Sequence, residues 1–411
     1  MNKTKSFCIS KKCVWDAYKR VRANKGSAGC DGQSIQDFEK DLKNNLYKIW
    51  NRMSSGSYFA PPVLRVEIPK GDGSTRPLGI PTVSDRIAQM VVKLQLEPEL
   101  ERCFHTDSYG YRPNKSAAQA VGKARQMCWR YDWVVDLDIK GFFDNIDHEL
   151  LMRAVRKHAK HEWIILYVER WLKAPVQLPD GTICERTQGT PQGGVVSPLL
   201  ANLFLHYAFD KWLEKNFPHN PFERYADDSI VHCHSEREAK MLKEAIANRL
   251  KECKLELHPK KTKVVYCKDA NRREDALIVS FDFLGFTFRP RTSRNRSGKL
   301  FVNFSPAISQ KAKTRIASVI KGWNLHMRSG LSIQQIADNI NPMVRGWISY
   351  YGRFHKSALH PILHILNWRL FRWAYRKYKR FKRSFRRVII WMKHVSCTHP
   401  KLFTHWSLLN G

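Results

Sequence analysis

Residues 133–139, WVVDLDI, and residues 222–234, FERYADDSIVHCH, are the stretches that decide the fold. The first is a short apolar run with acids at alternate positions, which predicts a strand that ends at Asp138. The second predicts a strand, a two-residue turn formed by Asp227 and Asp228, and a second strand. If the two strand ends lie side by side, three carboxylates converge at one edge of a sheet.

Three converging carboxylates indicate a particular chemistry. They repel one another and raise one another's pKa unless a cation lies between them. Hard oxygen ligands suit Mg²⁺, which keeps bound waters and accepts substrate phosphates. Two such ions, roughly 3.5–4 Å apart, stabilise both the attacking and the leaving oxygen of a nucleotidyl transfer. Taken alone, an Asp-Asp pair is weak evidence, because aspartate also favours turns for local hydrogen-bonding reasons.

Composition limits the possible partners and locations. The 411 residues suggest two or three domains, and their 43% hydrophobic content is enough for buried cores. The 71 lysines and arginines exceed the 37 acids by 34, so a polyanionic partner is expected. No apolar run approaches the ~18 residues of a membrane span, which argues against an integral membrane protein. The start of the chain lacks the apolar region of a signal peptide, and ten scattered cysteines without a C-x-x-C pair favour a reduced, cytoplasmic protein.

The positive charge is concentrated at one end of the chain. Residues 289–411 hold 25 lysines and arginines and a single acid, Asp338, so they carry +24 of the total +34. The densest part, RLFRWAYRKYKRFKRSFRR at residues 369–387, is predicted to be helical. Its interleaved aromatics and cations favour nucleic-acid binding over a solvated basic face. A membrane-surface helix is less consistent, because the aromatics fall on several faces.

The remaining patterns predict alternating helices and strands. A helical extension surrounds the loop 24–32, a hairpin with a Gly-Asp-Gly turn covers 63–81, and a charged linker at 289–299 precedes an all-helical region. We expect Asp144 to cap the helix within 140–158, and His232 and His234 to be structural rather than zinc ligands. Further helices are expected at 85–100 (ending near Pro98), 117–129, 195–213 and 237–253, and further strands at 181–185, 263–266 and 280–288.

The order of the motifs carries a resemblance. Between LDIKGFFD and YADD lies TQGTPQGGVVSPLLANLFL, and the chain also contains RPLGIP (76–81), SYGYRP (108–113), LELHPKKT (255–262), FLGF (283–286) and GWISYYGRFH (346–355). In this order, over about residues 20–405, the sequence resembles the reverse transcriptases encoded by bacterial group II introns. The resemblance implies an α+β fold: a right-hand polymerase, with fingers and palm built on antiparallel sheet, followed by an all-helical thumb or maturase (X) domain.

The resemblance also implies how the chain is divided. It places an N-terminal extension and fingertip loop at 1–60, fingers and palm at 61–288, the thumb/maturase domain at 289–395 and a short DNA-binding-like tail at 396–411. Because Gly411 leaves no room for a His-Asn-His endonuclease, the chain is similar to the short, endonuclease-lacking, group IIC-like class.

The implied function is an RNA-directed DNA polymerase that copies intron RNA and acts as a maturase in group II intron splicing and mobility. Two Mg²⁺ ions, replaceable by Mn²⁺, are expected as cofactors. The expected partners are intron RNA, an RNA template/DNA primer duplex, dNTPs and target DNA, in the bacterial cytoplasm and at the nucleoid, with the oligomeric state open. A host-adopted enzyme of DNA repair or phage defence, a splicing-only maturase and an RNA-copying RNA polymerase are the alternatives.

Site residues follow from the matched motifs. The metals are expected on Asp138, Asp227 and Asp228 and on the backbone carbonyl of Ile139. Phe143 is expected to exclude a 2′-hydroxyl and thus select deoxynucleotides, with core packing as the alternative. The other expected nucleotide contacts are Lys70 and Arg76 (triphosphate), Gln192 (nucleotide and template base) and Lys261 (leaving pyrophosphate). The basic segment 369–387, rather than a motif, supplies the expected RNA contacts Arg372, Arg376, Lys379, Arg380 and Arg383.

Overall fold

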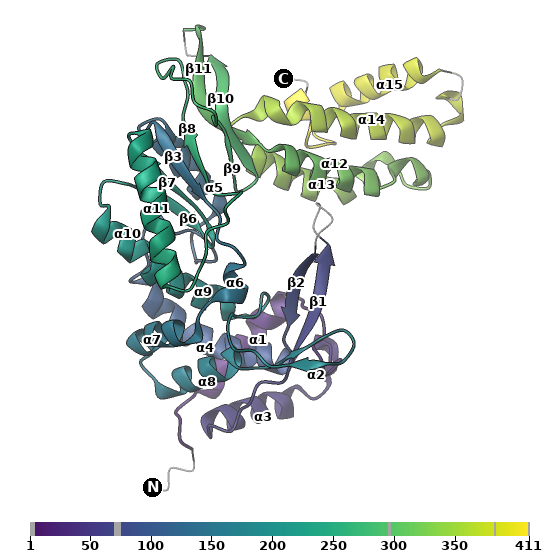
Figure 1. Cartoon of the computed structure of the whole chain (residues 1–411). Coiled ribbons are helices and arrows are strands. Elements are labelled where there is room, and N and C mark those ends of the chain that lie inside the picture. The colour runs from purple at the N-terminus through teal and green to yellow at the C-terminus, as the bar shows by residue number, and fades with distance from the viewer. Residues whose placement is uncertain (1–4, 70–74, 295–296, 382–383, 410–411) are drawn as a thin grey trace. The chain divides into compact units, whose positions relative to one another are not determined.

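The protein forms two compact units in a computed structural model (Figure 1). The structure describes residues 5–69, 75–294, 297–381 and 384–409. The first unit comprises residues 1–120 and 134–264, and the second comprises residues 121–133 and 265–411. Helices and largely antiparallel sheets occur together, which confirms the α+β class.

The first unit begins with the predicted helical extension. Its helices are α1 (Lys11–Ala23), α2 (Ile35–Lys40) and α3 (Leu42–Ser54). The side chains of Ser10 and Ser34 accept backbone N–H groups at the starts of α1 and α2. These bonds satisfy donors that a helix start leaves without an intrahelical partner, so the sequence sets both helix starts locally.

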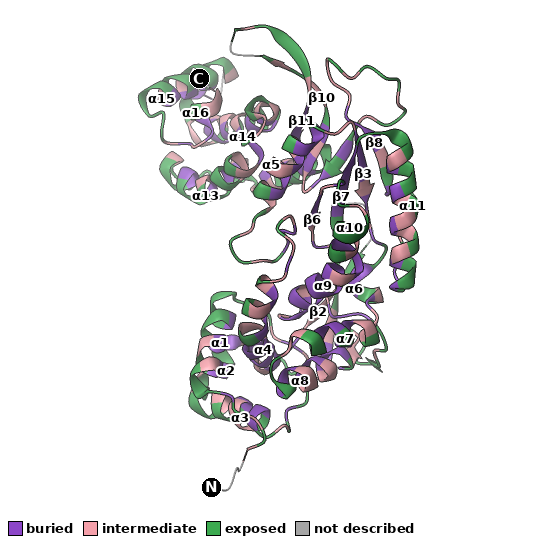
Figure 2. Cartoon of the chain, turned by 90° about the vertical axis from the view of Figure 1, so that its left-hand side faces the viewer, coloured by how far each residue is buried: buried purple, intermediate pink, exposed green. Residues whose placement is uncertain are grey.

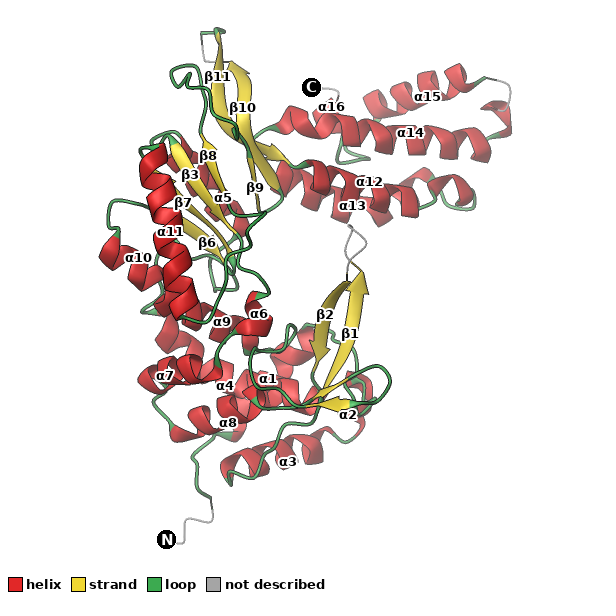
Figure 3. Ribbon diagram, in the orientation of Figure 1, coloured by secondary structure: helices red, strands yellow, loops and turns green. Residues whose placement is uncertain are grey.

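A small sheet follows the helical extension (Figure 3). Strands β1 (Val63–Pro69) and β2 (Thr75–Ile80) form the predicted antiparallel hairpin, whose Gly-Asp-Gly turn lies outside the described residues. The sheet has the order β2-β1-β4-β5, with short strands β4 (Val176–Gln177) and β5 (Ile183–Cys184).

The helix predicted to stop near Pro98 continues as α4 (Val83–Glu101). The predicted range 85–100 is confirmed to within two residues at each end. Buried Leu96 and Leu100 hold the turn after Pro98 against the core, which outweighs the hydrogen bond that proline cannot make. The other helices of this unit are α6 (Phe142–Asn145), α7 (His148–His158), α8 (Glu162–Leu172), α9 (Ser197–Leu205), the π-helical turn η1 (His206–Asp210), α10 (Lys211–Asn216) and α11 (Glu236–Glu252).

The second sheet has the order β6-β7-β3-β8, with β6 (Phe222–Tyr225), β7 (Asp228–Cys233), β3 (Trp133–Leu137) and β8 (Lys263–Tyr266). Its strands are mostly buried, and α11 packs on β7 with an exposed outer face (Figure 2). Tyr225 pairs with Asp228 across the β6–β7 hairpin. The turn therefore consists of Ala226 and Asp227, which corrects the prediction that both aspartates lie in it.

Asp144 does not cap the following helix as predicted. It lies inside the short helix α6, and Asp147 caps α7 by accepting the N–H of Leu150 at 2.9 Å. Two aspartates three residues apart compete for one cap, and only the second stands immediately before the first helical residue.

The second unit opens with most of α5 (Ala117–Cys128), then the antiparallel sheet β9–β10–β11 and a set of helices. The predicted strand 280–288 is divided, because Leu284 and Gly285 adopt positive φ values of 49° and 80° and turn the chain. The first part of the predicted linker 289–299 belongs instead to β10 (Phe286–Arg294), which pairs with β11 (Leu300–Ile308), and residues 295–296 lie outside the described residues. Phe281 of β9 (Phe281–Phe283) stacks on Phe288 at 4.6 Å, and both rings are buried.

Helices complete this unit. They are α12 (Gln310–Gly322), η2 (Leu325–Met327), α13 (Ile333–Tyr351), η3 (Lys356–Leu359), α14 (His360–Lys377), η4 (Lys379–Phe381), α15 (Phe385–Thr398) and α16 (Trp406–Leu409).

The basic segment 369–387 is not one helix as predicted. Helix α14 ends at Lys377, and Tyr378 is extended before η4 and α15 follow. An aromatic cluster stabilises this turn, because Tyr378 lies 5.7 Å from Phe381 and 5.3 Å from Trp391. In the part of the chain that the structure describes, no helix has the length and apolar character needed to cross a membrane.

Candidate active site

The three predicted aspartates lie near one another in the first unit. Asp138 directly follows β3, Asp227 lies in the β6–β7 turn, and Asp228 begins β7, the neighbour of β3 in the sheet. Burial raises the pKa of Asp227, the charge of Asp138 raises it further, and Arg76 opposes the rise. The sheet thus brings together carboxylates that are 89 positions apart in the sequence.

The charges of both other carboxylates affect the pKa of Asp228. The residue keeps an exposed surface, but protein atoms crowd its carboxylate. This loss of hydration, followed by the charges of Asp227 and Asp138, raises its pKa from 3.8 to about 6, while Lys261 opposes the rise. A cation bound between these groups would relieve their mutual repulsion.

The donor set fits magnesium in its chemistry. Carboxylate oxygens are the ligands that this ion prefers. The pKa values of Asp227 and Asp228 are raised mainly by burial and further by the charges of the neighbouring aspartates. Within residues 5–69, 75–294, 297–381 and 384–409, however, no three His, Cys, Asp or Glu side chains already enclose a metal-sized space. The ligand assignments, including the Ile139 carbonyl, therefore stay predictions.

The backbone around Asp138 is held by the loop that follows α11. The N–H of His258 donates to the Asp138 carbonyl at 2.7 Å, and the N–H of Lys140 donates to the Glu256 carbonyl at 2.9 Å. Ile139, between these bonds, forms an isolated bridge with Leu257. The motif LELHPKKT thus fixes the direction of the chain at the first catalytic candidate.

The same loop supplies a lysine to the acidic cluster. Lys261 places its Nζ atom 3.3 Å from Oδ2 of Asp138. Both side chains keep contact with solvent, so the pair stabilises the fold by little. The role of Lys261 toward the leaving pyrophosphate stays a prediction.

A chain of hydrogen bonds leads from the β1–β2 hairpin to α6. Nε of Arg76 donates to Oε1 of Gln192 at 2.6 Å, and Nε2 of Gln192 donates to Oδ2 of Asp144 at 3.3 Å. The backbone joins too, since the N–H of Gly79 donates to the Gln192 carbonyl at 2.7 Å. Arg76 and Gln192, predicted to contact the nucleotide, are thus brought together, while Lys70 lies outside the described residues.

The glycines of PQGG allow this close approach. Gly193 has φ = 122°, and a Cβ atom there would lie 2.4 Å from the Gly79 carbonyl oxygen. Such a separation is a clash, and this φ value strains any residue with a side chain. Glycine is therefore required for the loop to pack on β2.

Gln89, which the sequence analysis missed, holds the other side of this loop. Its Oε1 accepts the N–H groups of Val195 at 2.8 Å and Val196 at 3.3 Å. Its Nε2 donates to buried Asp85, which also accepts from Trp171 at 2.7 Å. The sequence did contain a signal for this role, namely a glutamine on the apolar face of a helix, because a buried amide needs hydrogen-bond partners.

Arg224 supports the aspartate turn and was also missed. It is fully buried and donates to both carboxylate oxygens of Asp210, at 2.7 and 2.6 Å. Its Nη1 donates to Asn202 and to the carbonyl of Ala226, each at 3.0 Å. Ala226 has φ = 57°, a left-handed conformation that is costly for alanine. The guanidinium thus holds the strained residue that directs Asp227.

Phe143 is buried, with 6% of its surface exposed. Its ring contacts Phe142 edge-to-face at 5.4 Å, and its carbonyl accepts the N–H of Thr190 at 2.7 Å. These contacts match the core-packing alternative, and the role in deoxynucleotide selection stays a prediction.

The predicted RNA contacts lie in the second unit. Arg372, Arg376, Lys379 and Arg380 are exposed, whereas Arg383 lies outside the described residues. Arg380 lies over Phe381 at 4.8 Å, so a cation and an aromatic ring share one surface.

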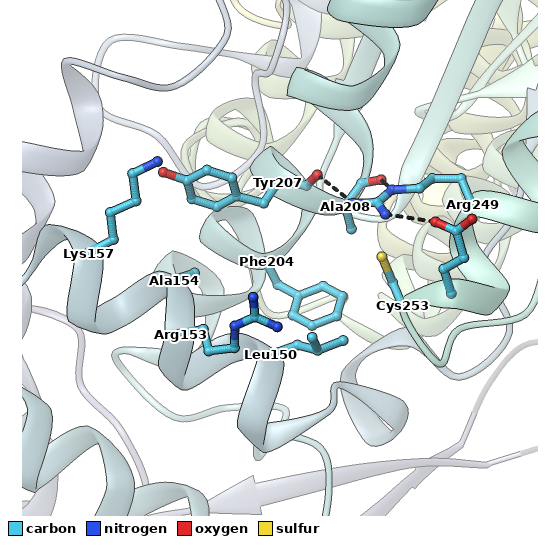
Figure 4. Close-up of a pocket in the computed structure, with 10 residues that line it drawn as sticks. Leu150, Arg153, Ala154, Lys157, Phe204, Tyr207, Ala208, Arg249 and Cys253 are labelled. Atoms are coloured by element: carbon cyan, nitrogen blue, oxygen red, sulfur yellow. Dashed lines mark hydrogen bonds and ion pairs between the residues drawn. The ribbon is translucent and has the colours of Figure 1, made fainter.

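Two other features of the first unit lie outside the predicted site. His232 pairs with Glu223 at 2.6 Å in the interior, which agrees with a structural histidine. A cavity of about 440 Å³ is lined by side chains of α7, η1 and α11, among them Arg153, Tyr207 and Arg249 (Figure 4). None of the predicted catalytic residues lines this cavity.

Comparisons with known families agree with this arrangement. Residues 68–288 match the family described as reverse transcriptase (RNA-dependent DNA polymerase), so the protein belongs to this family. Residues 313–391 match the maturase-specific domain of group II introns.

Individual relatives are more distant. Protein YkfC of Escherichia coli (strain K12) is 34% identical over 209 residues, which cover 49% of this chain and 54% of that protein. The group II intron-encoded protein LtrA of Lactococcus lactis subsp. cremoris is 35% identical over 193 residues, which cover 46% of this chain and 32% of that protein. The matched region thus spans about half or less of these relatives.

Proposed function

We propose that this protein is an RNA-directed DNA polymerase that copies group II intron RNA and assists its splicing and mobility as a maturase. The observation that carries the proposal is the position of Asp138, Asp227 and Asp228 at the ends of neighbouring strands of one sheet, in the same unit as the Arg76–Gln192 pair. The match to the reverse transcriptase family and to the maturase-specific domain supports it.

In this proposal the three aspartates and the Ile139 carbonyl hold two Mg²⁺ ions, which Mn²⁺ could replace. When bound, the ions supply positive charge for the attacking and leaving oxygens. Arg76, together with Lys70, binds the triphosphate of the dNTP, and Gln192 contacts the nucleotide and the template base. Lys261 donates a hydrogen bond or a proton to the departing pyrophosphate.

The remaining parts bind nucleic acid. We assign 1–60 to the fingertip extension, 61–288 to fingers and palm, 289–395 to the thumb/maturase domain and 396–411 to a DNA-binding-like tail. The net charge of +24 on residues 289–411 supports binding of intron RNA, the template/primer duplex and target DNA. The proposed location is the bacterial cytoplasm, including the nucleoid.

Primer extension tests the catalytic assignment. Asp227→Asn should abolish Mg²⁺-dependent dNTP incorporation on an RNA template and should leave RNA affinity within about twofold. Asp338→Asn, which removes an exposed carboxylate of α13, is the matched control and should extend normally. Normal extension by Asp227→Asn would refute the assignment, and RNA binding without extension by the wild-type protein would favour a splicing-only maturase.

A further inference from the structure

A hollow on α14 combines aromatic rings with arginine side chains. It has a volume of about 420 Å³ and is lined by Trp368, Arg372, Tyr375, Arg376 and Phe385. The first four lie on α14 at spacings of four, seven and eight residues from Trp368, so they share one helical face. Phe385, the first residue of α15, completes the lining from the neighbouring helix. Every lining side chain is thus an aromatic or an arginine.

The aromatic rings are arranged with their faces inclined to one another. Trp368 is 52% exposed and lies 4.9 Å from Phe385 at an interplanar angle of 59°. Tyr375 lies 5.7 Å from Phe385 at 52°. Because these pairs are tilted rather than stacked, neither contact covers a ring face in parallel.

The same helix shows what packing alone requires. Trp373 is fully buried and donates its indole N–H to the Arg328 carbonyl at 3.0 Å. One tryptophan of α14 therefore serves the core, and a second is left half exposed beside a hollow, where apolar surface in water costs free energy.

The arginines give the hollow its charge. Arg372 and Arg376 are exposed, and among the described residues neither takes part in an ion pair with a carboxylate. Burial lowers the pKa of nearby His326, and the charges of Arg376 and Arg372 lower it further. Asp338 is the one acid between residues 289 and 411, so this part of the chain offers little to balance the two guanidinium groups.

We propose that this hollow binds an unpaired nucleotide of a nucleic-acid strand, with the base against Trp368, Tyr375 and Phe385 and its phosphates on Arg372 and Arg376. The inference rests on the proposed nucleic-acid function and names the ligand of this surface. Bases of any identity have π-faces that stack on aromatic side chains, and an arginine fork matches phosphate oxygens. A base inside a duplex is already stacked and paired, so the ligand is a bulge, a loop or a strand end.

The test compares two RNA hairpins that differ only in one bulged position, which carries either an adenine or an abasic site. Fluorescence anisotropy at fixed salt gives the ratio of their dissociation constants. The full-length protein should prefer the adenine bulge by about tenfold, the size expected of one stacked base. Trp368→Ala should bring the ratio close to one, and Trp368→Phe, which keeps a ring, should restore part of it.

Ile365→Ala is the matched control. Ile365 is 40% exposed on α14 but does not line the hollow, so its variant should keep the tenfold ratio. A wild-type ratio near one, or an unchanged ratio in Trp368→Ala, would overturn the proposal. The same hairpins made of DNA distinguish the source of the strand, because a preference confined to RNA or to DNA identifies which one enters the hollow.

The proposed function and this inference fail separately. Asp227→Asn should lose primer extension but keep the tenfold ratio, since Asp227 lies in the other unit. If the wild-type protein extends primers but its ratio of dissociation constants is near one, the nucleotide-binding proposal for the hollow fails and the polymerase proposal stands. If the ratio is tenfold but the wild-type protein does not extend primers, the proposal for the hollow stands and the polymerase proposal fails.

Discussion

Replacing Arg224 with methionine tests whether a buried ion pair both stabilises the first unit and directs the aspartate turn. The change leaves the fully buried carboxylate of Asp210 without its two strongest donors and removes the bonds to Asn202 and to the Ala226 carbonyl. Removing one partner of a buried pair typically costs about 3–5 kcal/mol. Chemical denaturation should therefore show the free energy of unfolding of this unit falling by that amount.

The double variant separates stability from positioning. In Arg224→Met/Asp210→Leu no charge of this pair remains buried, so most of the lost stability should return, to within about 1–2 kcal/mol of the wild type. The donor to the Ala226 carbonyl is still missing, and a left-handed alanine costs of order 1–3 kcal/mol, so the turn should relax. Because small displacements of catalytic groups are costly, kcat for primer extension should fall at least about tenfold.

Arg272→Met is the matched control for the single variant. Arg272 is a partly buried arginine that pairs with Asp269 and donates to the carbonyls of Cys128 and Tyr131, in the other unit. It should lower stability without changing kcat of the folded protein. Full extension by the double variant, or a loss of less than about 1 kcal/mol in Arg224→Met, would refute the reasoning.

Four other changes address the site and the basic region. Asp228→Asn should raise the melting temperature of the metal-free protein more at pH 7.5 than at pH 4.5. A carboxyl whose pKa is raised from 3.8 to about 6 on folding loses stability as pH rises between these two pKa values, and the loss is complete above them; equal gains at both pH values would contradict this. Gln89→Met leaves two backbone N–H groups unpaired and should cost about 2 kcal/mol and raise KM for dNTPs, which an unchanged KM would disprove. Phe143→Ala should raise ribonucleotide incorporation relative to deoxynucleotides, and an unchanged ratio would leave only core packing. Two single variants that neutralise Arg372 or Lys379 should each reduce the slope of log RNA affinity against log salt concentration by about 1, and a constant slope would locate the RNA contact elsewhere.

The sequence predicted the strands and the acidic cluster well, because local patterns determine them. The alternation in WVVDLDI and the turn in FERYADDSIVHCH depend on neighbouring residues, and the structure confirms both hairpin strands and the placement of Asp138 after β3. The register of the hairpin was harder to predict from the sequence. Whether Asp228 belongs to the turn or to the strand depends on its pairing with Tyr225, which tertiary contacts decide.

Errors occurred where burial overrode a local signal. The charges of 289–299 suggested a linker, but residues 289–294 pair in β10, where buried Phe288 packs on Phe281. The support of the site was missed for a related reason. Arg224 also binds Asp210 and Asn202, 14 and 22 positions away, and Gln89 binds Val195, 106 positions away. A sequence pattern contains no information about such distant pairs unless the fold is known.

The π-helical turn η1 makes the number of residues between α9 and Asp210 important for the position of the aspartate turn. Helix α9 begins at Ser197, and Asp210 is the last residue of the π-helical turn that follows it. The width of this turn therefore sets the direction in which the side chain of Asp210 points. Each residue of a helix advances the side-chain direction by about 100°. Losing one residue between Leu205 and Asp210 would swing the carboxylate away from the arginine under the aspartate turn. Insertions and deletions in this short stretch should therefore be as harmful to activity as substitutions of the proposed metal ligands.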